Sequence, residues 1–218
     1  MSTTNFRELV AKNAHSVMIC ATCLSEVAEG DLPQPGWVGS RYEPCEGILF
    51  VMQNPGAAPK NYKEERDSCM QTELLLFKNS NTLAAYERLA QVFLEDATGR
   101  NKWKQPWKKW SHPVSKIVSD PQEMAWLNVV KVRTKGNAAL SLSQVRHGIS
   151  HHLTVEIESL NPALVVTIGK DAQISVAEIS GKLKNSFVTA SLHGMSPSNA
   201  DADKVKSTWQ NLRNGQKP

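Results

Sequence analysis

The stretch Gly47-Ile-Leu-Phe-Val-Met52, followed by Gln53-Asn-Pro-Gly56, decides the fold of this chain. Its first part is a continuous apolar run as long as one strand, and its second part is a turn signal. A strand that is apolar at every position is typical of a parallel sheet covered on both faces. We therefore expect residues 47–52 to form a buried parallel strand whose carboxyl end opens into a loop at residues 53–56.

Three further apolar runs continue this pattern and predict strands at residues 124–132, 164–168 and 187–190. Apolar residues at helical spacing predict helices at residues 5–19, 82–96, from Ser141 or Ser143 to Ser159, 171–179 and 200–212. The Pro- and Gly-rich residues 30–46 and the polar residues 57–81 are expected to be irregular. The alternation of strands and helices predicts a three-layer α/β/α fold with a central, mostly parallel four-stranded sheet.

The length and composition limit the kind of protein. With 218 residues, 40% hydrophobic and 21% charged, the chain is expected to form one globular domain at residues 1–218, with a cysteine-bearing N-terminal segment at about residues 15–70. No apolar run approaches the roughly 20 residues that span a bilayer. Residues 1–12 also lack the apolar region of a signal peptide. We therefore expect a cytoplasmic monomer with no membrane partner.

The predicted sheet also locates the functional site. In parallel α/β sheets, ligands bind at the carboxyl ends of the strands. Four segments of this chain lie there: Gln53 to Gly56, the polar Asn128, the turn at Gly169, and the stretch after Ala190 that contains His193. These segments are the candidates for a shared binding or catalytic site.

The same four segments carry a family resemblance. They are Met52-Gln-Asn-Pro-Gly56, Leu127-Asn-Val-Val-Lys131, Asn161-Pro-Ala-Leu-Val-Val-Thr-Ile-Gly169 and Leu192-His-Gly-Met-Ser-Pro-Ser198. In this order, and over about residues 46–210, the chain resembles the uracil-DNA glycosylase superfamily. The first motif is closest to the mismatch-specific and single-strand-selective branches. The Asn-Val-Val-Lys stretch is typical of the iron–sulfur branch.

The resemblance implies a monofunctional enzyme that flips a pyrimidine out of DNA and hydrolyses its bond to the sugar. It implies that Asn54 positions the attacking water and that His193 donates a hydrogen bond to the departing base. Asn128 would pair with the edge of the base. Other interpretations stay open: Asn54 as a turn residue, His193 as a surface histidine behind the insertion Gly194-Met195, and Asn128 bonded to a neighbouring loop.

Further residues are candidates for recognising the base. Gly56 stands where the most uracil-restricted branch has an aromatic residue, so the resemblance implies room for substituents on C5 of the pyrimidine. Gln53 belongs to the same loop, and Phe77, or else Tyr62, is a candidate for stacking on the flipped base.

The expected partner is DNA. The net charge is +4, and basic residues from Arg100 to Lys116 interleave with tryptophans, which suits a polyanion with stacking bases. A solvated segment whose tryptophans pack on the core is the alternative. Hydroxyls, basic side chains and the helix start after Gly169 are the candidate DNA contacts: Ser196, Ser198, Lys170, Lys131, Arg133, Lys104 and Trp107.

The cysteines predict a possible structural metal. Cys20 and Cys23 have the spacing at which two thiolates reach one metal, and Cys45 and Cys69 would complete a four-thiolate site for Zn²⁺ or a [4Fe-4S] cluster. Four unligated cysteines are the alternative. The iron–sulfur branch has two of its cysteines after the Asn-Val-Val-Lys stretch, and this chain has none there. No metal is expected in the chemistry.

The histidines of the helix after Ser141 are interpreted as not binding metal. His147 and His151 share a helix face, with His152 beside them, but the segment lacks a His-Glu-x-x-His pattern.

Several functions are consistent with the sequence. The leading one is a glycosylase for uracil or a C5-modified pyrimidine, without β-elimination, because no lysine stands in the motif positions for a Schiff base. The alternatives are a glycosylase for hypermodified bases, for example in defence against modified phage DNA, and a non-catalytic module that binds DNA or modified bases. A hydrolase of small N-glycosides is disfavoured by the basic, tryptophan-rich segment.

Overall fold

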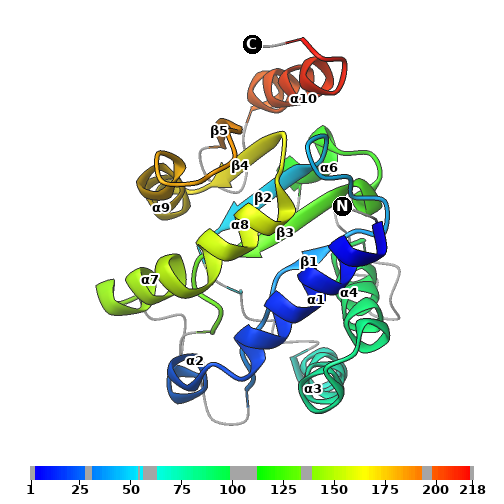
Figure 1. Cartoon of the computed structure of the whole chain (residues 1–218), viewed down its shortest axis with the longest axis vertical. Coiled ribbons are helices and arrows are strands. Elements are labelled where there is room, and N and C mark those ends of the chain that lie inside the picture. The colour runs from blue at the N-terminus through cyan, green and yellow to red at the C-terminus, as the bar shows by residue number, and fades with distance from the viewer. Residues whose placement is uncertain are drawn as a thin grey trace.

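The protein is built around a five-stranded sheet in the order β1-β3-β2-β4-β5 (Figure 1). The computed structural model describes residues 3–27, 31–53, 55, 63–98, 112–133, 139–192 and 198–216. The strands are β1 (Trp37–Val38), β2 (Ile48–Met52), β3 (Met124–Asn128), β4 (Leu164–Ile168) and β5 (Val188–Leu192). Strands β2 to β5 are parallel, and β1 pairs antiparallel with β3. The predicted α/β fold with a mostly parallel sheet is confirmed, and β1 adds a strand inside the segment that was expected to be a loop.

Helices precede, connect and follow the strands. They are α1 (Thr3–Met18), α2 (Ala21–Glu26), α3 (Lys63–Ser80), α4 (Leu83–Thr98), α6 (His112–Ile117), α7 (Leu142–Gly148), α8 (Thr154–Leu160), α9 (Lys170–Ser180) and α10 (Asn199–Arg213). A 3-10 turn (Pro121–Glu123) leads into β3, and a π-helical turn (Ile149–Leu153) joins α7 to α8. None of the described helices is long and apolar enough to cross a bilayer.

Alternating side chains of β2 build two cores, one on each face of the sheet. Leu49 and Val51 belong to a core that contains residues of α1, α3, α8 and α9. Ile48 and Phe50 belong to the other core, with residues of α6 and α10. Helix α4 contributes Tyr86 to the first core and other residues to the second, and it contacts β1. All of Ile48 to Val51 are fully buried, as the apolar run predicted.

Helix α3 corrects the expectation that residues 57–81 are irregular. Its core-facing residues are Met70, Leu74 and Phe77, a stripe at helical spacing. The neighbouring Leu75 and Leu76 are 49% and 47% exposed, and they hide this stripe in the sequence.

The predicted second strand also ends earlier than expected. Strand β3 stops at Asn128, although Val129, Val130 and Val132 are buried. The apolar run continues because the chain passes into the core of helices after it leaves the sheet.

Candidate functional site

The carboxyl ends of four parallel strands meet at one edge of the sheet. The register pairs Met52 with Asn128, and Ile168 with Leu192. Beyond β2 and β3, the Val129 amide donates to the Met52 carbonyl at 2.8 Å, and the Val130 amide donates to the Gln53 carbonyl at 2.9 Å. The backbone therefore holds the start of the Gln53 loop directly beside Asn128.

Asn128 is the most informative described residue at this edge. Asn128 is only 9% exposed. A side-chain amide at such a position costs about 1–3 kcal/mol if it is left buried without a partner. The Asn128 amide can therefore hydrogen-bond a ligand that reaches the edge.

The chain order places a crossover point at the same edge. Strand β3 lies on one side of β2, and the next strand, β4, lies on the other. Ligands of open α/β sheets bind where the strand order reverses. At the end of β4, Gly169 has a φ of 92°, and a Cβ atom added there would meet nothing within 4 Å. Helix α9 starts here with the exposed Lys170, so its first amides are suited to an anion.

Several predicted site residues lie outside the described residues: Asn54, Gly56, Tyr62, Lys104, Trp107, His193 and Ser196. The described ends of β2 and β5, at Gln53 and Leu192, lead directly into Asn54 and His193. The predicted roles of these residues stay predictions.

Two of the predicted contacts are wrong. Phe77 was expected to stack on a base, but it is fully buried in the helical core, where its ring packs edge-on against His15 and tilted against Tyr86. Lys131 was expected to contact DNA, but its ammonium is buried and donates to the Glu156 carboxylate at 2.5 Å. Both residues look accessible in the sequence because burial by distant helices leaves no local pattern.

Two other candidates for DNA contacts, Ser198 and Arg133, differ in their exposure to solvent. Ser198 is exposed and caps α10, since its hydroxyl accepts from the Asp201 amide at 3.1 Å and donates to the Asp201 carboxylate. Arg133 is partly buried, five residues beyond the end of β3. A phosphate contact of Ser198 would compete with its capping bond.

A second site lies where the end of α1 meets the π-turn. Cys20, Cys23, His147 and His152 place one ligand atom each within 4.8 Å of one another, so this cluster could hold a metal ion. The Cys20 Sγ lies 3.2 Å from Nε2 of His147, and the Cys23 Sγ lies 3.3 Å from Nε2 of His152. His147 and His152, which the sequence interpretation left out of a metal site, therefore belong to this cluster.

The π-turn explains why His147 and His152 come together. In a regular α-helix, residues five apart point about 140° away from each other. In the turn Ile149–Leu153, the Thr154 amide bonds back to the Ile149 carbonyl, five residues earlier. This wider turn rotates His152 back toward His147, and their ring centroids lie 5.4 Å apart. Such turns occur often at functional sites.

Burial sets the charge state of the cluster when no ion is present. Burial, and then the hydrogen bond with Cys20, raise the pKa of the Cys23 thiol to about 12. Burial, and then the ammonium of Lys131, lower the pKa of His152 to about 3. The pKa of His147 is lowered by burial and then by His151. Cys23 and His152 are therefore neutral at pH 7.

The two other cysteines do not join the cluster. Cys45 is exposed beside the starts of β2 and β4, where its Sγ accepts a hydrogen bond from the Asn161 amide at 2.8 Å. It shares a surface pocket with Phe6 and Leu9 of α1, whereas Cys20 follows the opposite end of that helix. Cys69 is exposed on α3. The expected four-cysteine ligand set is therefore wrong.

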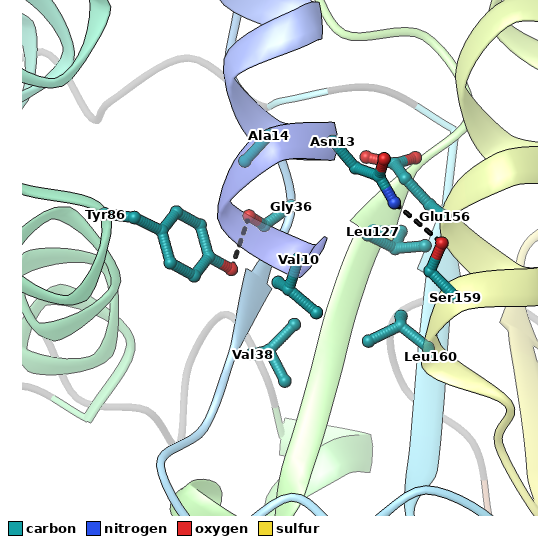
Figure 2. A pocket seen from close by; sticks show the side chains of 10 residues that line it. All are labelled: Val10, Asn13, Ala14, Gly36, Val38, Tyr86, Leu127, Glu156, Ser159 and Leu160. Atoms are coloured by element: carbon teal, nitrogen blue, oxygen red, sulfur yellow. Dashed lines mark hydrogen bonds between the residues drawn. The ribbon is translucent and has the colours of Figure 1, made fainter. Parts of the chain in front are cut away.

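A small cavity between α1, α4, α8 and β3 is too small to be the base site (Figure 2). Its volume is about 20 Å³, roughly that needed for one water molecule. The Asn13 amide donates to the Ser159 hydroxyl at 2.7 Å at its wall, and the Tyr86 hydroxyl donates to the Gly36 carbonyl. A nucleobase at the sheet edge would lie outside this cavity.

Comparisons with protein-family models and with curated proteins found no match for this chain.

Proposed function

We propose that this protein is a monofunctional DNA glycosylase that hydrolyses the N-glycosidic bond of uracil or a C5-modified pyrimidine extruded from DNA. The observation that supports this proposal is the nearly buried Asn128 amide, which lies beside the loop that begins at Gln53. An amide offers both a donor and an acceptor, which match the edge of a pyrimidine. We also propose that the protein acts as a monomer in the cytoplasm.

The reaction needs three tasks from this chain. As the glycosidic bond breaks, the sugar becomes oxocarbenium-like and negative charge moves onto the base. Asn54 would orient the water that attacks the anomeric carbon, and His193 would donate a hydrogen bond to the base carbonyl. Asn128 would hold the extruded base in register. All three residues belong to segments at the carboxyl ends of parallel strands.

The environment of Lys131 supports hydrolysis without strand cleavage. It is the lysine of the second motif, and β-elimination would require a free amine. Its ammonium is buried in an ion pair with Glu156, which holds it away from the sheet edge. An abasic site is therefore the expected product.

A metal ion at the cysteine–histidine cluster would be structural under this proposal. Four protein ligand atoms already face one another there, which leaves no open position for a water or a substrate. The water would instead be positioned by Asn54.

A binding module without catalysis is the second candidate. The insertion Gly194-Met195 separates His193 from Ser196 and Pro197 and alters the motif that would stabilise the leaving base. A glycosylase for hypermodified bases would share the chemistry of the first candidate and differ only in the base accepted beside Gly56.

An oligonucleotide assay separates these candidates. The purified chain is incubated with single- and double-stranded oligonucleotides that carry uracil, 5-hydroxymethyluracil or modified cytosine, and abasic sites are then cleaved with alkali. The proposal predicts cleavage that Asn54→Ala abolishes and that Asn211→Ala, an exposed asparagine of α10, leaves unchanged. Salt-sensitive binding without abasic sites would instead support the binding module. Absence of both would contradict the two candidates.

A further inference from the structure

We propose that Cys20, Cys23, His147 and His152 form a closed, tetrahedral structural zinc site that fastens the end of α1 and α2 to the π-turn behind β3. The proposal does not depend on the glycosylase activity, because the same geometry would stabilise the fold of a binding module.

The distances fit a tetrahedron around one Zn²⁺ ion. Zn–S bonds of about 2.3 Å and Zn–N bonds of about 2.0–2.1 Å place neighbouring sulfur and nitrogen atoms about 3.5 Å apart. The Cys20–His147 and Cys23–His152 sulfur–nitrogen distances are 3.2 Å and 3.3 Å, and all four ligand atoms lie within 4.8 Å of one another. These sulfur–nitrogen distances are a few tenths of an ångström shorter than in a zinc site, because hydrogen bonds between thiol and imidazole take the place of the bonds to the metal.

The spacing of the ligands also fits zinc. Cys20 and Cys23 are separated by two residues, and His147 and His152 by four. Structural zinc sites with two cysteines and two histidines use such spacings. Both histidines present Nε2 to a sulfur, and the Nδ1 of His152 is buried without a partner. Nε2 is thus the ring atom of His152 that faces the cluster.

A [4Fe-4S] cluster does not fit this donor set. Such clusters are held by four thiolates in most proteins. Only two thiols are present here, because Cys45 and Cys69 are exposed elsewhere. A two-iron cluster with two cysteines and two histidines binds the sulfurs and the nitrogens on different irons, which does not fit sulfur–nitrogen distances as short as 3.2 Å and 3.3 Å. Two thiolates and two neutral imidazoles neutralise Zn²⁺, which suits a partly buried site. The nearby ammonium of Lys131 also favours the thiolate form of Cys23.

The zinc site would join segments that are distant in the sequence. Cys20 begins the short helix α2, and its Sγ accepts from the Cys23 amide at 3.5 Å, the only side-chain cap of that helix. The histidines flank Gly148, whose position is so close to the Val129 carbonyl that a Cβ would lie 2.1 Å from that oxygen. Zinc at this point would therefore hold α1 and α2 against the backbone that follows Asn128.

Metal analysis of the full chain tests the proposal. The protein is purified without chelator, and zinc and iron are measured by plasma mass spectrometry. The expected result is one zinc per chain and no stoichiometric iron. Replacement of zinc by Co²⁺ should give the intense visible bands of a tetrahedral site with thiolate ligands. His147→Ala and His152→Ala should each weaken zinc affinity by about 100-fold or more.

Matched variants keep the test decisive. His151→Ala removes an exposed histidine of the same turn, and Cys45→Ser and Cys69→Ser remove the exposed thiols; all three should keep the full zinc content. His147→Cys should restore binding that His147→Ala loses, which separates loss of a ligand from loss of folding.

Two results would overturn the proposal. One is a protein that is folded by circular dichroism, takes up no zinc and shows no cobalt bands. The other is a brown protein whose iron content depends on Cys45 or Cys69.

Discussion

The edge of the sheet and the cysteine–histidine cluster are built in opposite ways. At the edge, backbone hydrogen bonds and strand register fix the positions of Gln53 and Asn128, and the side chain of Asn128 is not needed for that geometry. In the cluster, four side chains from segments more than 120 residues apart must meet at one point. Substitutions at the edge should therefore change function before stability, and substitutions in the cluster should change stability first.

The two regions meet at the stretch after β3. Lys131 extends from that stretch into the helical core, where Glu156 of α8 neutralises it. Gly148, between the cluster histidines, touches the carbonyl of Val129. Through these contacts, a substitution in one region should change the structure of the other.

Lys131→Ala should produce the largest loss of stability. It would leave the Glu156 carboxylate, only 7% exposed, without its partner. Breaking a buried ion pair in this way costs about 3–5 kcal/mol. Urea unfolding measures the change. The double replacement Lys131→Met with Glu156→Leu should recover most of the stability, because it removes both buried charges; no recovery would show that the charges are not the cause.

Asn128→Ala should lower glycosylase activity while leaving stability nearly unchanged. Loss of one good hydrogen-bonding contact to a base costs about 1–3 kcal/mol, or roughly 5- to 150-fold in kcat/KM. The free energy of unfolding should stay within about 0.5 kcal/mol, because strand register and backbone hydrogen bonds hold this edge of the sheet. Single-turnover kinetics and urea unfolding test both parts. A large destabilisation would show that the amide serves the fold.

Gly148→Ala should disturb both regions at once. The new Cβ would lie 2.1 Å from the Val129 carbonyl oxygen, so backbone must move. Overpacking of this kind costs about 1–3 kcal/mol. Zinc content and activity should fall together in this variant. Gly181→Ala is the control, because a Cβ at Gly181 meets nothing within 4 Å. An unchanged melting temperature in Gly148→Ala would contradict the close packing of the two regions.

Ser141→Ala should have the smallest effect. Ser141 and Gln144 form a capping box at the start of α7, with the Ser141 Oγ accepting from the Gln144 amide at 3.2 Å. Loss of such a cap costs about 1 kcal/mol. Thermal unfolding measures it, and Ser207→Ala on the exposed surface of α10 is the control. Zinc content should not change, because the cap lies more than one helical turn from His147.

The sequence predicted the four parallel strands whose carboxyl ends form the edge beside Gln53 and Asn128. Their apolar runs are local signals, and the run that ends at Met52 alone locates the carboxyl edge. Strand β1 was missed because Trp37 and Val38 form only two residues of strand, set by pairing with Trp126 and Ala125 of β3. Such pairing leaves no local pattern.

The metal ligands show where sequence reasoning failed. The spacing of Cys20 and Cys23 indicated a site, but the sequence alone suggested the other cysteines as its partners. The histidines that meet Cys20 and Cys23 come together through a π-helical turn, which turns His152 toward His147 and has no simple sequence signal. The burial of Phe77 and Lys131 was missed for a related reason, since helices distant in sequence cover both.

The most direct test of the account is the amount of free base released from uracil-containing and C5-modified oligonucleotides, measured by mass spectrometry for the native chain and for Asn128→Ala. If the sheet edge reads an extruded base, the native chain should release one free pyrimidine for each abasic site that it forms. An Asn128→Ala variant that is equally stable should release the base much more slowly. If the native chain released no pyrimidine from any of these substrates, or if Asn128→Ala released it at the native rate, the sheet edge would not be the site that reads an extruded base.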